Sequence, residues 1–453
     1  MSNTKGERIS MESHRLTQGS LMGHLIRLAV PLIIGNILQQ FYNTIDALVL
    51  SRFASAGEFA AVGVSSSVMN LFLFAVVGAC TGIGVIFAQL YGAEDMGAFR
   101  TEHYLVLIFG ILLTICAGIL GVCGSGLLLD LIQTPDEIHV YAKSYLQIVL
   151  GALPFSFVYN FYGAMLRAVG HPKVPLMILA AASAVNLILD LLFVISFGWG
   201  IRGAAWATAA AQAFSAVLCV IYLKVCFRQF MFRRRDCRMD KSLLFKTAHY
   251  SFITGLQQTG LYIGKLLVQG SVNTAGTAVI SAYTATTRIE GFINSFGDSG
   301  AAATSVVVAQ NFGARQKERV RKSFSDSFLL MLVFGLLASV LLYCTAGALV
   351  EFLLGTDQGE AYIQSVQYIH VVSVFYVFCY TGNTFAGYFD GCGKMIFTFL
   401  GSVSHIALRA VLSWIWIGEG GLASVAYATG IGWAAVNLFW MVYYFRGKKK
   451  DKF

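Results

Sequence analysis

The chain has 453 residues, of which 57% are hydrophobic and only 12% are charged, and its mean hydropathy is +0.69. Soluble domains carry about 25% charged residues, so this composition excludes an ordinary water-facing globular protein. With five prolines and so little polar sequence, the chain has no room for a sizeable extramembrane domain. The net charge of +9 would suit nucleic-acid binding, but the placement of the charges favours another explanation.

Long apolar runs recur along the whole chain. A hydrocarbon core about 30 Å thick needs roughly 20 apolar residues per helix. The first twenty residues are polar and lack the apolar core of a signal peptide, so we expect the first apolar run to be retained as a helix. The runs predict twelve transmembrane helices, at 25–50, 59–91, 102–124, 141–166, 174–198, 203–226, 243–272, 277–312, 323–346, 361–389, 395–417 and 421–445.

Lys and Arg concentrate in alternate connections between these predicted helices. The intervening connections hold acids instead, and only Arg52, Lys143 and Arg202 break the pattern. By the positive-inside rule we expect both termini on the cytoplasmic side of the membrane. The basic surplus therefore indicates membrane topology, and no nucleic-acid partner is expected.

Four short motifs occur twice, in the same order, at an offset of 218 to 221 residues. Four collinear pairs at nearly one offset indicate a duplication, whereas any single pair would be a chance match among small apolar residues. The pairs are LeuGlnGln at 38–40 and 256–258, AlaGly at 56–57 and 275–276, AlaGlnLeuTyrGlyAla at 88–93 and AlaGlnAsnPheGlyAla at 309–314, and TrpAlaThr at 206–208 and TyrAlaThr at 427–429.

The duplication predicts an all-α integral membrane protein with two six-helix lobes. Because each half has an even number of spans, the lobes should be related by a pseudo-two-fold axis along the membrane normal, as in transporters built from parallel repeats. The expected parts are an N-terminal tail at 1–20, an N-lobe at 21–226, a basic cytoplasmic linker at 227–242, a C-lobe at 243–445 and a basic tail at 446–453.

Ionisable residues inside predicted spans are functional candidates, because charges are costly in a bilayer. Asp46, Asp190 and Thr208 lie at similar predicted depths in the outer half of the N-lobe, and Asn186 is one helical turn from Asp190. Such an oxygen-rich, anionic pocket could hold a proton shared between the carboxyls, or a Na⁺ ion. The alternative is that one Asp only caps or hydrogen-bonds a broken helix. We place ion or proton coupling on these four residues.

The corresponding part of the C-lobe is cationic. At an offset of 219, Asp46 corresponds to Lys265, and the acid of the fifth span corresponds to a position near Arg409. Arg288 and Glu290 fall at comparable depth, and an ion pair of Glu290 with Lys265 or Arg288 would neutralise part of the cluster. The candidates for the substrate path are Gln39, Tyr42, Asn43, Lys265, Arg288, Glu290 and Arg409.

Pro31 should bend the first helix, either as a static kink or as a hinge whose bend changes with the protonation of Asp46. The sequence has no Walker motif, so ATP coupling is disfavoured. No enzymatic reaction and no cofactor are expected, and no metal beyond a possible Na⁺ at Asp46, Asn186, Asp190 and Thr208.

The chain resembles the prokaryotic multidrug and toxic compound extrusion (MATE) transporters over residues 20–445. The resemblance rests on motifs spread over the first half: AlaValProLeuIle at 29–33, GlnGlnPheTyrAsnThrIleAspAla at 39–47, AlaAlaValGlyValSer at 60–65, AlaGlnLeuTyrGlyAla at 88–93, LeuArgAlaValGly at 166–170 and AsnLeuIleLeuAsp at 186–190. It implies two six-helix lobes around a central cleft, the cation and proton site at Asp46, Asn186, Asp190 and Thr208, and proposed bending at Pro31. The C-lobe departs from the family: it has Gln257, Gln258 and TyrThrGlyAsn at 380–383 where some members bear acids, and Asp390 where the first half has Arg167.

These observations together predict a secondary active multidrug efflux antiporter. It would export organic, often cationic, drugs or metabolites in exchange for H⁺ or Na⁺ by alternating access, as a monomer in the lipid bilayer. The cationic C-lobe cluster raises the possibility of anionic or zwitterionic substrates. The alternatives are a lipid-linked precursor flippase of the same superfamily, which the anionic N-lobe disfavours, and a non-transporting membrane receptor or scaffold.

Overall fold

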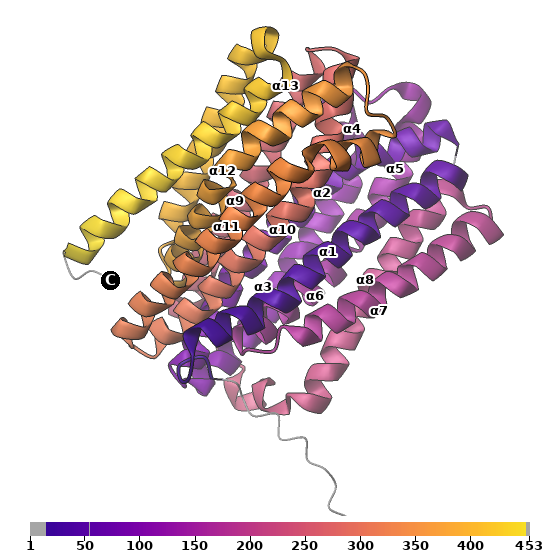
Figure 1. The fold of residues 1–453 in the computed structure, drawn as a ribbon. Helices are drawn as coiled ribbons and strands as arrows, with labels where there is room; N and C mark the ends of the chain where they lie inside the picture. The colour runs from indigo at the N-terminus through magenta and orange to yellow at the C-terminus, as the bar shows by residue number, and fades with distance from the viewer. Residues whose placement is uncertain (1–14, 54, 450–453) are drawn as a thin grey trace, which may run out of the picture.

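The computed structural model describes residues 15–53 and 55–449, and every regular element among them is helical (Figure 1). Two short 3₁₀ turns, Arg228–Phe230 and Arg234–Asp236, lie in the linker, and the π-helical turn η1 spans Leu191–Ser196. The α-helices are α1 Leu21–Phe53, α2 Ala56–Gly92, α3 Met96–Cys123, α4 Ser125–Leu131, α5 Asp136–Gly151, α6 Leu153–Ala168, α7 Lys173–Asp190, α8 Gly200–Cys226, α9 Lys241–Asn273, α10 Thr277–Gly313, α11 Lys317–Leu354, α12 Glu360–Gly391 and α13 Met395–Lys449.

These helices form the predicted twelve crossings. α5 and α6 make one crossing with a bend of 44°, and η1 extends α7. α13 comprises two crossings, because Gly421 interrupts it with φ 55° and ψ −147°. By length and hydropathy, eight of the described helices could span a membrane, or nine with the bent pair. α9 and α10 fall outside that number, since many neutral polar residues, together with charges such as Lys265 and Glu290, lower the hydropathy of their sequence.

Both described ends of the chain lie at one end of the bundle, which we call the terminal end (lower left in Figure 1). The linker lies at the same end and is docked rather than loose. The Asp236 carboxylate accepts hydrogen bonds from Arg100 Nε of α3 at 3.0 Å and from the Arg233 backbone at 2.9 Å. The Phe230 ring is buried against Phe99 and Phe227. The linker is therefore part of the N-lobe surface.

At the terminal end, the two lobes are joined by a reciprocal contact of the duplicated glutamines. Gln89 of α2 donates to the backbone oxygen of Gly391 at 3.1 Å, and Gln310 of α10 donates to that of Ala168 at 2.6 Å. Gln89 thus binds the last residue of α12 in the C-lobe, and Gln310 binds the last residue of α6 in the N-lobe. These two helix ends belong to the equivalent fourth spans of the two lobes. We call this arrangement the crossed-glutamine contact.

Two glycines make the crossed-glutamine contact possible. A Cβ atom on Gly92 would collide with the backbone of Gln310, and one on Gly313 would collide with the backbone of Gln89. The last turns of α2 and α10 therefore cross with their backbones in direct contact, which only a residue without a side chain permits.

The segment before α1 covers this crossing. The Leu16 N–H donates to Gln310 Oε1 at 3.0 Å, and the Leu16 carbonyl accepts from Asn311 at 3.3 Å and from Arg319 at 3.1 Å. Arg15 forms an ion pair with Glu94 of the N-lobe at 2.6 Å. One backbone residue of the N-terminal segment is therefore bound by the C-lobe while its neighbour is bound by the N-lobe.

Contacts between the lobes extend from the terminal end to the middle of the bundle. Asn36 of α1 donates to Ser299 of α10 at 3.1 Å. Farther along, ring pairs join the lobes: Phe41 with Phe292, with centroids 5.6 Å apart, and Phe74 with Tyr262, 5.2 Å apart. Asp46 lies beyond these pairs on α1.

We expect Gly92→Ala to destabilise the protein, because its new methyl group would force the α2–α10 crossing apart, and overpacking costs about 1–3 kcal/mol. Gly63→Ala on the same helix is the matched control, since nothing lies within 4 Å of a Cβ at that site. The measurement is the midpoint of thermal unfolding in detergent. Equal midpoints for the two variants would contradict the close crossing.

Candidate functional site

Residues from three helices gather in the half of the N-lobe that lies away from the terminal end. α1 carries Tyr42 and Asp46, α7 carries Asn186 and Asp190 at its last turn, and α8 carries Thr208. The Asn186 and Asp190 side chains are each only 1% exposed, and Asp46 is half-buried. The four residues predicted to couple ions or protons are thus brought together.

Hydrogen bonds hold this group in one arrangement. With its amide oriented to satisfy both neighbours, Asn186 donates to Asp190 Oδ2 at 2.8 Å and accepts from the Thr208 backbone N–H at 3.2 Å. The Asp46 and Asp190 carboxyls hydrogen-bond to each other, and the Tyr42 hydroxyl bonds to the Thr208 side chain. Thr208 therefore contributes both its backbone and its hydroxyl.

The contact between the two carboxyls defines the chemistry of the site. Two ionised carboxylates in contact repel each other, so a hydrogen bond between Asp46 and Asp190 requires a shared proton. Oδ1 of each carboxyl is buried and accepts no hydrogen bond from any other described group. The pair can thus take up and release a proton.

Two features of the site were missed by the sequence analysis. Tyr145 of α5 is 3% exposed and lies within electrostatic range of both Asp46 and Asp190. The π-helical turn η1 begins directly after Asp190, and such turns occur frequently at functional sites. A neutral tyrosine in an apolar span carries no charge signal, and no residue type specifies a π turn, so neither could be found from composition or spacing.

Gln39 and Asn43 stand apart from the carboxyl pair. They lie one turn apart on α1, and Gln39 Nε2 donates to Asn43 Oδ1 at 3.2 Å on an exposed face. Pro31 lies inside α1, which is continuous from Leu21 to Phe53. Whether the helix bends during a cycle stays a prediction.

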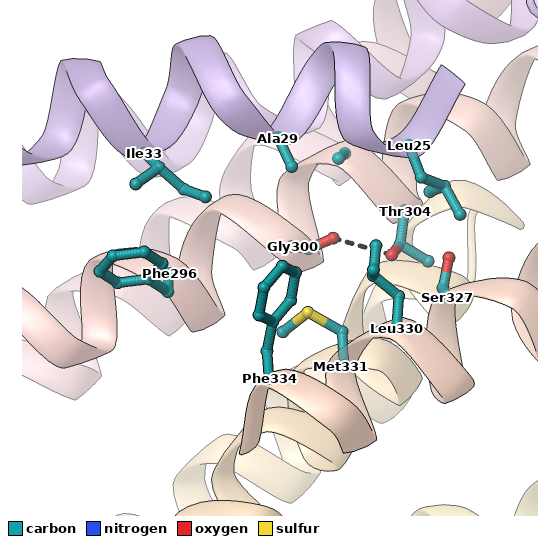
Figure 2. Close-up of a pocket in the computed structure, with 11 residues that line it drawn as sticks. Leu25, Ala29, Ile33, Phe296, Gly300, Thr304, Ser327, Leu330, Met331 and Phe334 are labelled. Carbon is teal, nitrogen blue, oxygen red and sulfur yellow. Dashed lines mark hydrogen bonds between the residues drawn. The ribbon is translucent and has the colours of Figure 1, made fainter. Parts of the chain in front are cut away.

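The half of α1 that contains Pro31 packs on the C-lobe rather than on its own lobe. Leu25, Ala29 and Ile33 face α10 and α11 across a narrow, mainly apolar crevice, shown in Figure 2. Its hydroxyl groups belong to Thr304, which donates to the Gly300 carbonyl at 2.7 Å, and Ser327. With no charged side chain among its lining residues, this crevice is a packing seam and not a candidate ion site.

The predicted C-lobe residues separate into two places. Arg409 of α13 lies near Glu290 of α10, whose carboxylate accepts a hydrogen bond from the Tyr368 hydroxyl at 2.9 Å. Lys265 lies within electrostatic range of Asp298, and Arg288 is exposed. The ion pairs found between described residues do not include Glu290, so the alternative of an ion pair with Lys265 or Arg288 is not found there.

We expect Asn186→Ala to destabilise the N-lobe, because it leaves Asp190 Oδ2 and the Thr208 N–H buried without this partner, at about 1–3 kcal/mol. Ile188→Ala, on the same helix with 64% of its side chain exposed, is the control. The readout is the thermal unfolding midpoint in detergent. A midpoint for Asn186→Ala that matches the control would show that the amide does not bridge α7 and α8.

Comparison with known proteins identifies the family. A family model described as MatE matches residues 31–192 and 254–415, once in each half of the chain. The chain is similar to the probable multidrug resistance protein YpnP of Bacillus subtilis, with 27% identity over 419 residues that cover 91% of this chain and 93% of that protein. It is also 24% identical over 399 residues to the probable multidrug resistance protein NorM of Thermotoga maritima, covering 83% and 82%.

A solved structure of MATE in the straight conformation has a TM-score of 0.89 to this chain at 20% identity, covering 98% of this chain and 99% of that one. At this identity the likeness shows the fold alone, and it confirms the predicted two-lobe, twelve-helix architecture. Since the family model matches both halves of that architecture, the chain belongs to the MatE family, the multidrug and toxic compound extrusion transporters, which are integral membrane proteins and not enzymes.

Proposed function

We propose that this chain is a secondary active exporter of organic compounds, often cationic, driven by protons that enter as the substrate leaves. The family and its curated relatives named as multidrug resistance proteins support export of drugs or metabolites. The hydrogen bond between Asp46 and Asp190 is the single observation that carries the coupling.

The carboxyl contact favours H⁺ over Na⁺ as the coupling ion. A shared proton accounts for two carboxyls in direct contact, whereas a sodium ion would lie between the oxygens and separate them. Asn186 donates to Asp190 and so positions the pair, and Tyr42, which is bonded to Thr208, lies beside it. The Asp46 and Asp190 carboxyls therefore act as the proton site, and no cofactor is required.

α1 offers a mechanical route from this site to the lobe interface. Its first half packs on α10 and α11, at Leu25, Ala29 and Ile33, and its second half carries Asp46 against α7. When the carboxyls lose their shared proton, their mutual repulsion acts on α1 relative to α7. We infer that this force changes how α1 packs on the C-lobe, and that the helix bends at Pro31.

We further propose that the protein lies in the bacterial plasma membrane as a monomer, with the terminal end in the cytoplasm. The cations of both tails and of the linker 227–242 support this orientation. The bundle is then closed toward the cytoplasm by the crossed-glutamine contact, and the carboxyl pair lies on the outer side of the interlobe contacts, where protons enter from outside.

Transport in proteoliposomes tests the coupling. With a fluorescent organic cation as the probe, an imposed pH gradient should drive export by the wild-type protein, and an imposed Na⁺ gradient at constant pH should not. Asp46→Asn and Asp190→Asn should each remove the gradient-driven component, because an amide cannot take up the proton.

Asp357→Asn, at an exposed position between α11 and α12, is the control and should transport as the wild type does. Gradient-driven export that survives in Asp46→Asn would remove the carboxyl pair from the mechanism. Export driven by Na⁺ alone would overturn the choice of H⁺.

A further inference from the structure

The C-lobe carries a guanidinium at the place where the N-lobe carries its carboxyl pair. Gly170 and Gly393 both have positive φ, 85° and 74°, at the equivalent turns before α7 and α13, and they fix an offset of 223 residues there. At that offset Arg409 corresponds to Asn186, the residue that binds Asp190. The duplicated backbone thus places a cation in the C-lobe at the position of the amide that binds the N-lobe carboxyl.

The same offset relates the aromatic neighbours. Tyr145, which lies near the N-lobe carboxyls, corresponds to Tyr368, which lies near Arg409. Ser413 corresponds to Asp190 itself. The C-lobe site therefore has the same backbone arrangement as the N-lobe site. Its side chains differ, because Ser413 stands in place of the acid Asp190 and the cation Arg409 stands in place of the amide Asn186.

Several polar groups at this place have no hydrogen-bond partner among the residues that the structure describes. These are Arg409 Nε, the Tyr376 hydroxyl, His405 Nε2 and the Ser413 hydroxyl, and all of them are buried. Tyr376 and Ser413 are 0% exposed. Leaving a buried donor unsatisfied is costly, and more so for a charged one, so this set is suited to a ligand that the chain does not itself supply.

The unpartnered groups have a common chemistry. A guanidinium can only donate hydrogen bonds, and the tyrosine and serine hydroxyls can donate as well. Glu290, the nearby acid, already accepts from the Tyr368 hydroxyl at 2.9 Å, and the ion pairs of residues 15–53 and 55–449 include none between Glu290 and Arg409. A guanidinium with two parallel N–H donors matches a carboxylate in shape and charge.

We propose that Arg409, Tyr376 and Ser413 form a C-lobe site that binds the carboxylate group of a transported organic compound. Glu290, held by Tyr368, lies close enough to favour a basic group on the same molecule, so zwitterionic compounds fit the site better than simple anions. The N-lobe pair then serves the proton, and this C-lobe site sets which substrates are carried. The assignment deepens the proposed export function and rests on it for transport, although binding can be measured without transport.

The test compares two fluorescent dyes that differ in one group: a rhodamine with a free carboxylate, and its methyl ester. Their binding to the purified full-length protein in detergent is measured by fluorescence polarisation, at low ionic strength. The wild type should bind the free carboxylate more tightly than the ester. Arg409→Gln should weaken binding of the carboxylate dye by about tenfold or more, the loss expected for a charge-assisted bond, and should leave binding of the ester unchanged.

Two variants separate this reading from its alternatives. Arg238→Gln, which removes an exposed cation of the linker, controls for the loss of one positive charge and should bind both dyes as the wild type does. Tyr376→Phe, which removes only the unpartnered hydroxyl, should weaken binding of the carboxylate dye but not of the ester, and by less than Arg409→Gln does.

The outcomes also distinguish this inference from the export function. In proteoliposomes, Asp46→Asn should stop gradient-driven export of both dyes, whereas Arg409→Gln should stop only that of the carboxylate dye. The proposal is overturned if the wild type binds the ester dye and the carboxylate dye equally tightly. It is also overturned if Arg409→Gln leaves the binding of both dyes unchanged, or weakens the binding of both in the same proportion. Selective binding without gradient-driven export would support the site and contradict the export function.

Discussion

The two lobes meet where two glutamines cross, and the rest of the architecture depends on that meeting. Gln89 and Gln310 each bind a backbone carbonyl of the opposite lobe, over a crossing that Gly92 and Gly313 allow. A hydrogen bond of this kind contributes only about 0.5–1.5 kcal/mol net. Two such bonds are enough to favour one arrangement of the lobes and weak enough to break in each proposed transport cycle. The close backbone approach gives the contact its geometry, and the hydrogen bonds give it a modest strength.

The duplication supplies one backbone plan for both lobes, and the charges then differ. In the N-lobe two carboxyls are in hydrogen-bond contact, with Asn186 as the bridge between α7 and α8. In the C-lobe the equivalent of that bridge is Arg409, among hydroxyls that have no hydrogen-bond partner in the described part of the chain. A substrate and a proton therefore need not compete for the same group. In the proposed mechanism they act through different lobes, and α1, which packs on both, is the element through which one can influence the other.

The sequence predicted those parts of the molecule that follow from the free-energy cost of burying charged groups in a bilayer. Charged residues in apolar spans are rare and expensive, so Asp46 and Asp190 could be identified and placed at one depth from loop positions alone. The bounds of the twelve helices follow the apolar runs for the same reason, except where polar turns extend a helix beyond the bilayer, as in α11, expected at 323–346 and observed at Lys317–Leu354.

The repeated motif that contains Gln89 and Gln310 was recognised as a mark of duplication, but not as the lobe contact, because a hydrogen bond to a distant backbone carbonyl leaves no pattern in sequence. An ion pair of Glu290 with Lys265 or Arg288 could not be decided from the sequence, because spacing along a helix does not say which way a long cationic side chain turns. In the structure a neutral tyrosine, Tyr368, binds the carboxylate.

The backbone of Leu16 is bound by the C-lobe, and its neighbour Arg15 is paired with Glu94 of the N-lobe. The chain thus enters the bundle through the junction of the lobes, whereas the last helix ends at the edge of the C-lobe (Figure 1). The two termini are therefore unequal as attachment points for a fused domain. A fusion partner at the N-terminus would be tethered beside the junction that opens toward the cytoplasm in the proposed transport cycle, while one at the C-terminus would be attached at the periphery. Reporter and affinity domains are accordingly best placed after residue 449, where their bulk does not obstruct the separation of the lobes.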